Sequence, residues 1–185
     1  MTEAVSGSDR PRVVVSLTAS VDGRVTFNRS STLMDPDAAA LWQSIIPAGA
    51  RRLLDERRRW VESHHGHQMV LEGSGTFVTD DAAPVPELPA AEEDPEILRQ
   101  PYLPQGTNQR WFVVVDGRGR VRWTYHGNHE TRLLVLVCRA TPLSYLAFLR
   151  GEGIPYLLAG GSRVDLRSAL RLAIITSLVG LLPRS

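Results

Sequence analysis

The sequence contains a single cysteine, Cys138, so no disulfide can form within the chain. Absence of a disulfide fits a reducing compartment, and we predict a cytoplasmic location. Cys138 ends the apolar run 133–138. We therefore predict a buried strand residue here rather than a nucleophile.

The chain has almost no net charge, because 21 Lys and Arg residues stand against 20 Asp and Glu residues. A net charge of +1 cannot steer the protein to nucleic acid or to an anionic membrane, so any anion site must be local. Five arginines between positions 51 and 59 are interpreted as the solvated face of a helix, since no aromatic side chains interleave them as stacking on bases would favour. We predict no nucleic-acid partner.

Long hydrophobic runs are also missing. The most apolar tract, 172–182, is about half the length that a membrane-spanning helix needs. Residues 1–12 are polar and lack the apolar core of a signal peptide. The sequence therefore predicts neither a membrane partner nor secretion.

What the chain does contain is enough apolar sequence, 43% of its residues, to form one buried core. Short apolar runs predict extended segments at 13–17, 68–72, 111–115, 120–125, 133–138 and 154–158. Helical spacing and capping residues predict helices at 38–46, 50–63, 141–149 and 165–170. This alternation predicts an α/β fold, a three-layer sandwich with a mainly parallel central sheet. Its first strand, 13–17, is expected at the centre of the sheet.

The predicted organisation is a single folded domain with two atypical ends. We expect a flexible N-terminus over residues 1–11, the domain over 12–173, and an atypical end over 174–185 that is consistent with truncation or a frameshift. Residues 82–105 carry six prolines and an acidic run, and they predict a long surface excursion inside the domain.

Glycines follow the strand predicted at 68–72, in the sequence Gly73-Ser-Gly75-Thr76, and Asp80 comes shortly afterwards. Glycine lets backbone N–H groups approach a phosphate or a flat ring, and the Thr76 hydroxyl adds a donor. A glycine turn between a strand and a helix is also common in α/β proteins without any ligand, so the motif alone leaves both interpretations open.

A second motif makes the first more informative. Ser20-Val-Asp22-Gly23-Arg24 follows the first predicted strand, and Ser30-Ser31-Thr32 comes after it. Together the two motifs resemble the reductase domain of the bifunctional riboflavin-biosynthesis deaminase-reductase family, in the dihydrofolate-reductase-like superfamily. Segments 111–121 and 153–166 are similar to that family as well, and the resemblance covers roughly residues 11–173.

The resemblance implies an NADPH-dependent reductase that transfers a hydride to the ring-opened ribose carbon of 5-amino-6-(5-phosphoribosylamino)uracil, or acts on a related aminopyrimidine or pteridine. It also implies a homodimer. Carried over position by position, it implies cofactor contacts at Ala19, Leu33, Thr76 and Asp80. Gly73 and Gly75 are candidate cofactor-binding residues from the glycine motif itself. Substrate contacts are implied at Ser31 and His64.

Three further sets of residues are candidates for a functional role: two arginines, one aspartate and a group of histidines. Arg118 or Arg120 could pair with the 2′-phosphate of NADPH, or both could be solvated turn residues. Asp22 is the candidate catalytic acid or base, or a carboxylate that only holds its turn. The histidines in 64–67 cannot all face one ion easily, and no ligand set completes them, so we predict no metal site.

The resemblance fails near the end of the chain. The family has a strand leading into Glu-Gly-Gly-Gly after its Asp-Leu helix, and this sequence lacks that segment. Gly160-Gly161-Ser162 precedes the corresponding helix and matches a different position. The missing segment favours a rival interpretation, a truncated non-catalytic remnant that binds nucleotide or serves in dimerisation. A true dihydrofolate reductase is a further alternative.

Overall fold

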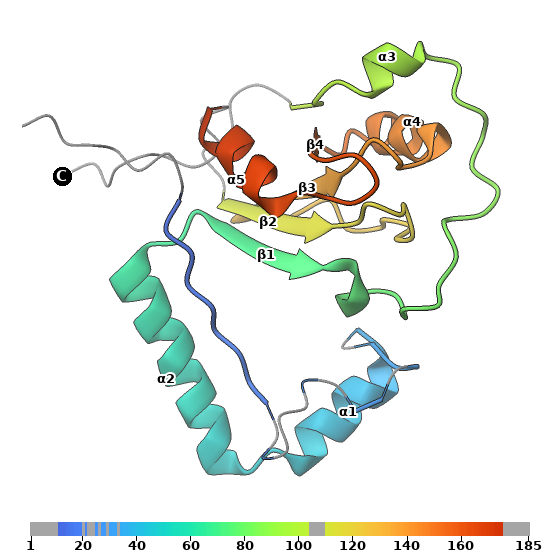
Figure 1. Ribbon diagram of the computed structural model, residues 1–185. Helices are drawn as coiled ribbons and strands as arrows, with labels where there is room; N and C mark the ends of the chain where they lie inside the picture. The colour runs from blue at the N-terminus through green and yellow to red at the C-terminus, as the bar shows by residue number, and fades with distance from the viewer. Residues whose placement is uncertain are drawn as a thin grey trace, which may run out of the picture.

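The fold is α/β, built on four parallel strands (Figure 1). The computed structural model describes residues 11–19, 21, 25, 27, 28, 30–32, 34–103 and 110–175. The strands are β1 (Met69–Gly73), β2 (Arg110–Val115), β3 (Thr131–Val137) and β4 (Tyr156–Leu158), in the order β1-β2-β3-β4. Helices flank this sheet, which confirms the predicted three-layer α/β class with a parallel sheet.

One face of the sheet carries the larger core. Helix α4 (Leu143–Gly151) covers it together with the short helix α3 (Pro95–Leu98), and alternate residues of β2 and β3 point into it. The largest fully buried side chains of this core are Leu98, Leu133, Tyr145, Leu146, Leu149 and Tyr156.

The opposite face is covered by α5 (Leu166–Ile175). Its buried cluster consists of Trp111, Val113, Leu134, Leu136, Leu157, Ala159 and Ala169. Asp165 begins the helix as predicted, because its Oδ1 accepts from the backbone N–H groups of Arg167 and Ser168 at 3.0 and 3.3 Å.

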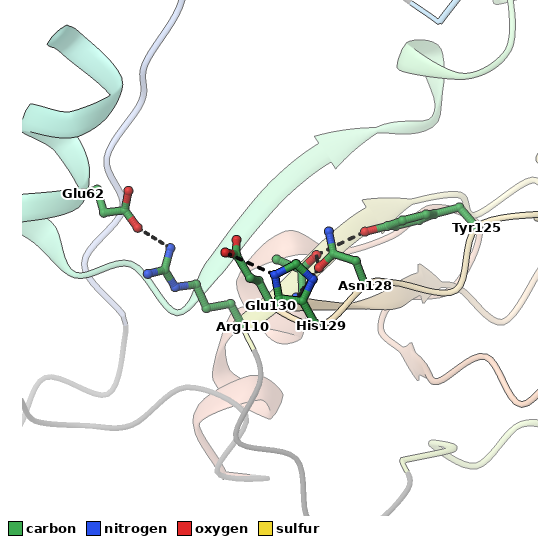
Figure 2. Close-up of polar contacts among 7 residues, drawn as sticks. Glu62, Arg110, Tyr125, Asn128, His129 and Glu130 are labelled. Atoms are coloured by element: carbon green, nitrogen blue, oxygen red, sulfur yellow. Dashed lines mark hydrogen bonds and ion pairs between the residues drawn. The ribbon is translucent and has the colours of Figure 1, made fainter. Parts of the chain in front are cut away.

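Helices α1 (Pro36–Ile45) and α2 (Ala48–His65) lie beside the sheet rather than over its faces (Figure 1). Asp35 caps α1 through bonds from the Asp37 and Ala38 amides, as the Asp-Pro-Asp sequence predicts. The expected amphipathic helix is present in α2, but none of its residues is buried. Its polar link to the sheet is an ion pair of 2.6 Å between Glu62 Oε1 and Arg110 Nη1 (Figure 2).

The prediction of a central strand at 13–17 is wrong. Val13, Val15 and Leu17 are 63%, 84% and 64% exposed, and these residues form no strand. In the part of the chain that the structure describes, β1 pairs with β2 alone, so it forms an edge of the sheet. Strand propensity depends on a partner strand, and the carbonyl of Leu17 instead accepts from Arg57 Nη1 of α2 at 2.9 Å.

The extended run expected at 120–125 is buried in part but is not a strand. Parallel strands β2 and β3 need a connection that returns to the starting end of the sheet, and this run belongs to that crossover. Val121 and Trp123 are 5% and 4% exposed, because the crossover passes over the larger core.

Residues 82–103 are mostly irregular and mostly exposed or half-buried, as predicted for a surface excursion, but parts of this segment pack against the sheet. Leu98 is fully buried, and Val85 and Leu88 pack against the larger core. The Val85 amide donates to the carbonyl of Gly119 at 2.8 Å. The apolar residues between the prolines therefore hold this segment against the sheet.

Cys138 follows β3 directly and is fully buried, which confirms its predicted burial. Its thiol donates weakly to the carbonyl of Gly117 at 3.5 Å. Among the described residues, no helix combines the length and hydropathy that crossing a membrane would require.

Candidate functional site

The carboxyl ends of the four strands lead into loops rich in glycine and polar residues. Because the strands are parallel, these loops gather at one edge of the sheet, where open α/β folds bind their ligands. The loops comprise residues 73–76, 116–120, 138–141 and 159–163.

A shallow hollow of about 500 Å³, largely open to solvent, lies at this edge beyond the end of β1, and we call it the cavity. Its two walls come from segments that are far apart in the sequence. Ser30, Thr32, Met34, Asp35 and Pro36 line one wall, and Phe77, Val78, Thr79 and Ala82 line the other. Its volume falls in the range of small-molecule sites, roughly 300–1,000 Å³, but it is far less enclosed than such sites.

The first wall is shaped by one asparagine side chain. Asn28 Oδ1 accepts from the backbone amides of Ser30 and Ser31 at 2.9 and 2.8 Å. Both serine hydroxyls donate to the same oxygen at 3.0 Å. Ser31, the expected substrate contact, thus lies between two residues that line the cavity and before the N-terminus of α1.

The second wall directly follows the glycine motif, which forms the 3-10 turn η1 (Ser74–Thr76) after β1. A Cβ added to Gly75 would meet nothing within 4 Å, and one added to Gly73 would meet only the amide nitrogen of Gly75 at 4.0 Å. The space over these glycines is therefore left open by the described protein. The Thr76 hydroxyl donates to Glu72 Oε2 at 3.1 Å, which fixes its orientation.

Arg118 and Arg120 differ in environment although they share one turn. Arg120 is 8% exposed, and its guanidinium donates to Ser74 Oγ and to the carbonyls of Thr79 and Asp80. Arg118 is exposed, and its Nη2 donates to the carbonyl of Asp80 at 3.1 Å. The structure thus leaves Arg118, rather than Arg120, accessible to an anion from solvent.

A buried carboxylate holds the Arg118–Arg120 turn. Asp116 is 1% exposed, and its Oδ2 accepts from the amides of Arg120 and Val121 at 2.8 and 2.9 Å. The Tyr145 hydroxyl donates to the same oxygen at 2.9 Å and accepts from Trp123 Nε1 at 2.9 Å. Burial, followed by the neighbouring Asp116 charge, raises the pKa of Tyr145 far above its usual value.

Two buried polar atoms of this network remain unpaired among the described residues, Asp116 Oδ1 and Arg120 Nε. Such atoms are costly unless water or a shift of the side chains satisfies them. At the rim, the pKa of Asp81 is lowered, chiefly because the Thr79 hydroxyl donates to its carboxylate. Asp80, the expected cofactor contact, is exposed beside it.

Other candidate residues are not brought to the cavity. His64 is the next-to-last residue of α2 and lies near the start of β1. The glycine motif follows the other end of β1, and a strand of five residues is about 16 Å long. The His64 ring stacks on Trp60 at 4.4 Å. Ala19 is exposed in the 11–19 segment and does not line the cavity. Asp22 and Leu33 lie outside the described residues.

The cluster of histidines around position 65 does not assemble a metal site in the part of the chain that the structure describes. No group of three or more His, Cys, Asp or Glu side chains there is placed to hold an ion. His65 instead packs edge-on against Trp60, with ring centroids 5.5 Å apart.

Two features of this edge were missed by sequence reasoning. One is the Asp116–Tyr145 bond, and its only local signal is an aspartate directly after a strand. The other is the loop at Gly160, whose φ of +90° brings its backbone close to Arg163 and Asp165. A strand followed immediately by Gly-Gly is the signal that could have placed this loop with the other three.

Comparisons with family models, with curated proteins and with solved structures give no match to this chain.

Proposed function

We propose that the protein is an NADPH-dependent reductase of the riboflavin-biosynthesis type. Its substrate in this proposal is 5-amino-6-(5-phosphoribosylamino)uracil or a related aminopyrimidine or pteridine. The assignment comes from the two sequence motifs that resemble the reductase family.

The observation that carries the proposal is that both motif regions contribute to one cavity. Ser30 and Thr32 belong to the first motif region, and Phe77 to Thr79 directly follow the second. The cavity lies at the carboxyl edge of a parallel sheet, the usual place for a nucleotide in such folds.

The residues around the glycine motif fit a dinucleotide. The open space over Gly73 and Gly75 would admit a flat ring or a phosphate close to the backbone. Arg118 would supply a guanidinium for the 2′-phosphate that distinguishes NADPH from NADH. Bound NADPH would supply the hydride, and the chain would orient both reactants and exclude water.

A fluorescence titration tests the proposal. The chain contains four tryptophans, and their quenching by NADPH and by NADH reports binding to each cofactor. We expect saturable binding in the micromolar range with a preference for NADPH. Arg118→Gln should weaken NADPH binding about tenfold or more and leave NADH binding unchanged, because only NADPH carries the 2′-phosphate.

Arg122→Gln is the matched control, since Arg122 is an exposed neighbour outside the turn. It should bind both cofactors as the wild type does. Absence of saturable binding to either cofactor would overturn the proposal. Equal losses in the two arginine variants would overturn the role of Arg118.

A non-catalytic nucleotide-binding protein is the second candidate, and one observation favours it. Asp35 is the only titratable residue among the described residues that line the cavity, and its carboxylate is engaged in capping α1. Single-turnover measurement of NADPH oxidation with aminopyrimidine ribotides separates the two functions. Cofactor binding without turnover would select the second candidate.

The homodimer belongs to the same proposal. Large apolar side chains outside the sheet, including Val15, Ile45 and Leu53, are 84%, 53% and 60% exposed. Burial of such residues commonly accompanies association. Sedimentation velocity at several concentrations would show whether the chain is dimeric.

A further inference from the structure

Phe77, Val78 and Thr79, which line the cavity, belong to residues 74–80, and we call residues 74–80 the wall segment, or simply the wall. This segment makes few hydrogen bonds within itself. Within it, the Ser74 carbonyl accepts from the amides of Phe77 and Val78 at 3.0 Å. The segment is not paired to a neighbouring strand beyond Gly73. Its shape must therefore depend on contacts from elsewhere in the fold.

Phe77 and Val78 pack against the larger core in the middle of the wall, and Arg120 supplies polar contacts at both of its ends. Its Nη2 donates to Ser74 Oγ at 2.8 Å, where the wall begins. Its Nη1 donates to the carbonyls of Thr79 and Asp80 at 2.8 and 3.3 Å, where the wall ends. A single planar guanidinium thus fixes the distance between the two ends.

Arg120 is itself immobilised by the core. The Asp116 carboxylate accepts from its backbone amide, and the Tyr145 hydroxyl fixes that carboxylate in turn. Gly119 adopts a φ of +66° and lies against the Tyr145 ring, where an added Cβ would come within 2.7 Å of the ring carbon Cγ. The turn therefore cannot shift without disturbing buried groups.

We infer that Arg120 is a positioning residue, which sets the shape of the proposed nucleotide cavity by holding residues 74–80 and does not itself contact the ligand. This inference rests on the proposed function for the identity of the ligand. Both terminal nitrogens of Arg120 are engaged with the wall, and the side chain is 8% exposed. The two arginines therefore differ in role: Arg120 is buried and holds both ends of the wall, whereas Arg118 is exposed, contacts only the Asp80 carbonyl among the described residues, and is the one proposed to meet the ligand.

Lysine is the informative replacement. It keeps the positive charge, but one ammonium on a flexible stem cannot span Ser74 and the Thr79 carbonyl as a guanidinium fork does. Arg120→Lys should thus loosen the wall while keeping a positive charge at this position. Arg122→Lys makes the same chemical change at an exposed neighbouring position and is the matched control.

The experiment combines two measurements on the full chain. Hydrogen exchange followed by mass spectrometry reports the opening of residues 74–82 in the absence of ligand. Titration with NADPH reports the affinity of the cavity for the cofactor. For Arg120→Lys we expect exchange in 74–82 to accelerate at least tenfold, with exchange in β3 unchanged, and NADPH affinity to fall at least tenfold for the same reason. Arg122→Lys should match the wild type in both measurements.

The NADPH and NADH affinities should fall together in Arg120→Lys, because a misplaced wall affects both cofactors. A loss confined to NADPH would mean that Arg120 binds the 2′-phosphate directly, and it would overturn the positioning role. Wild-type exchange in 74–82 would overturn it as well.

Failure of the proposed function can be recognised separately. If the wild type binds neither cofactor, that function fails, and the exchange result alone decides whether Arg120 holds the wall. If Arg120→Lys does not fold, Ser74→Ala takes its place, since it removes only the Nη2 contact. Accelerated exchange at 74–78 in that variant supports the inference, and unchanged exchange overturns it.

Discussion

The hydroxyl of Tyr145 lies 2.9 Å from Oδ2 of Asp116, and this bond joins helix α4 to the turn after β2. Both residues are about 1% exposed. The same hydroxyl accepts from Trp123 Nε1, so three segments of the chain meet at one oxygen atom. The turn that carries Arg118 and Arg120 is therefore anchored in the larger core.

Tyr145→Phe should destabilise the protein by about 1–3 kcal/mol, because it leaves the Trp123 N–H and the Asp116 carboxylate short of a buried partner. Urea denaturation followed by tryptophan fluorescence measures the change. Tyr125→Phe is the control, since Tyr125 is 37% exposed and its hydroxyl lies 3.1 Å from the Thr131 hydroxyl in an exposed hydrogen bond. Equal free energies of unfolding for the two variants would contradict the prediction.

Gly119→Ala should cost about 1–3 kcal/mol, since φ at this position is +66° and the new methyl group would overlap the Tyr145 ring. Gly151→Ala offers a matched control at the end of α4, where an added Cβ meets nothing within 4 Å. That variant should be neutral, or stabilised by up to about 1 kcal/mol. Thermal unfolding of both variants tests the prediction, which would be wrong if Gly119→Ala retained wild-type stability.

Leu98→Ala tests whether the proline-rich segment is part of the core. Leu98 is fully buried against α4, so its truncation should cost about 2–5 kcal/mol. Ile97→Ala, at a neighbouring residue that is 47% exposed, should cost about 0.5 kcal/mol or less. A free surface excursion would instead give small and similar losses for the two variants.

The Glu62–Arg110 ion pair should make the contact between α2 and the sheet sensitive to pH (Figure 2). The hydrogen bond from Arg110, and then its charge, lower the pKa of Glu62 below 4.5. A lowered carboxyl pKa stabilises the folded state above the unfolded value, and that contribution disappears as the pH falls through the folded value.

NMR titration of the Glu62 side-chain carbonyl checks this directly. Arg110→Gln should return the pKa toward 4.5, because it removes the two largest causes of the shift. Arg52→Gln is the control, since Arg52 lies on the same helix and pairs with Glu56 at 3.6 Å. A wild-type pKa of Glu62 at or above 4.5 would refute the prediction, and added salt should weaken the shift because both side chains are 46% exposed.

Much of the local structure followed from residues within a few positions of one another. Asp35-Pro36 begins α1 and Asp165 begins α5, because a short acidic side chain satisfies the first free N–H groups of a helix wherever the chain folds. The apolar runs at 111–115 and 133–138 became β2 and most of β3, and this too was visible in a short stretch of sequence. Continuous burial of both faces favours parallel strands.

The candidate site was only partly predictable. The glycine motif and Ser31 were identified, and the structure places the surroundings of both at one cavity. His64 was placed with them by resemblance alone, and the direction of β1 separates it from that cavity. Nothing local to Arg118 and Arg120 indicated that one would be exposed and the other buried.

By itself, the sequence determined the parallel α/β class, the starts of its capped helices and the glycine turn after β1, because these depend on local propensity and on the hydrophobic period. Only the tertiary structure decided which segments found partners. Residues 13–17 remained exposed despite their β-branched side chains, and Leu98 became buried within a proline-rich stretch. Arg120 joined the wall of the cavity because residues distant in sequence supply its acceptors.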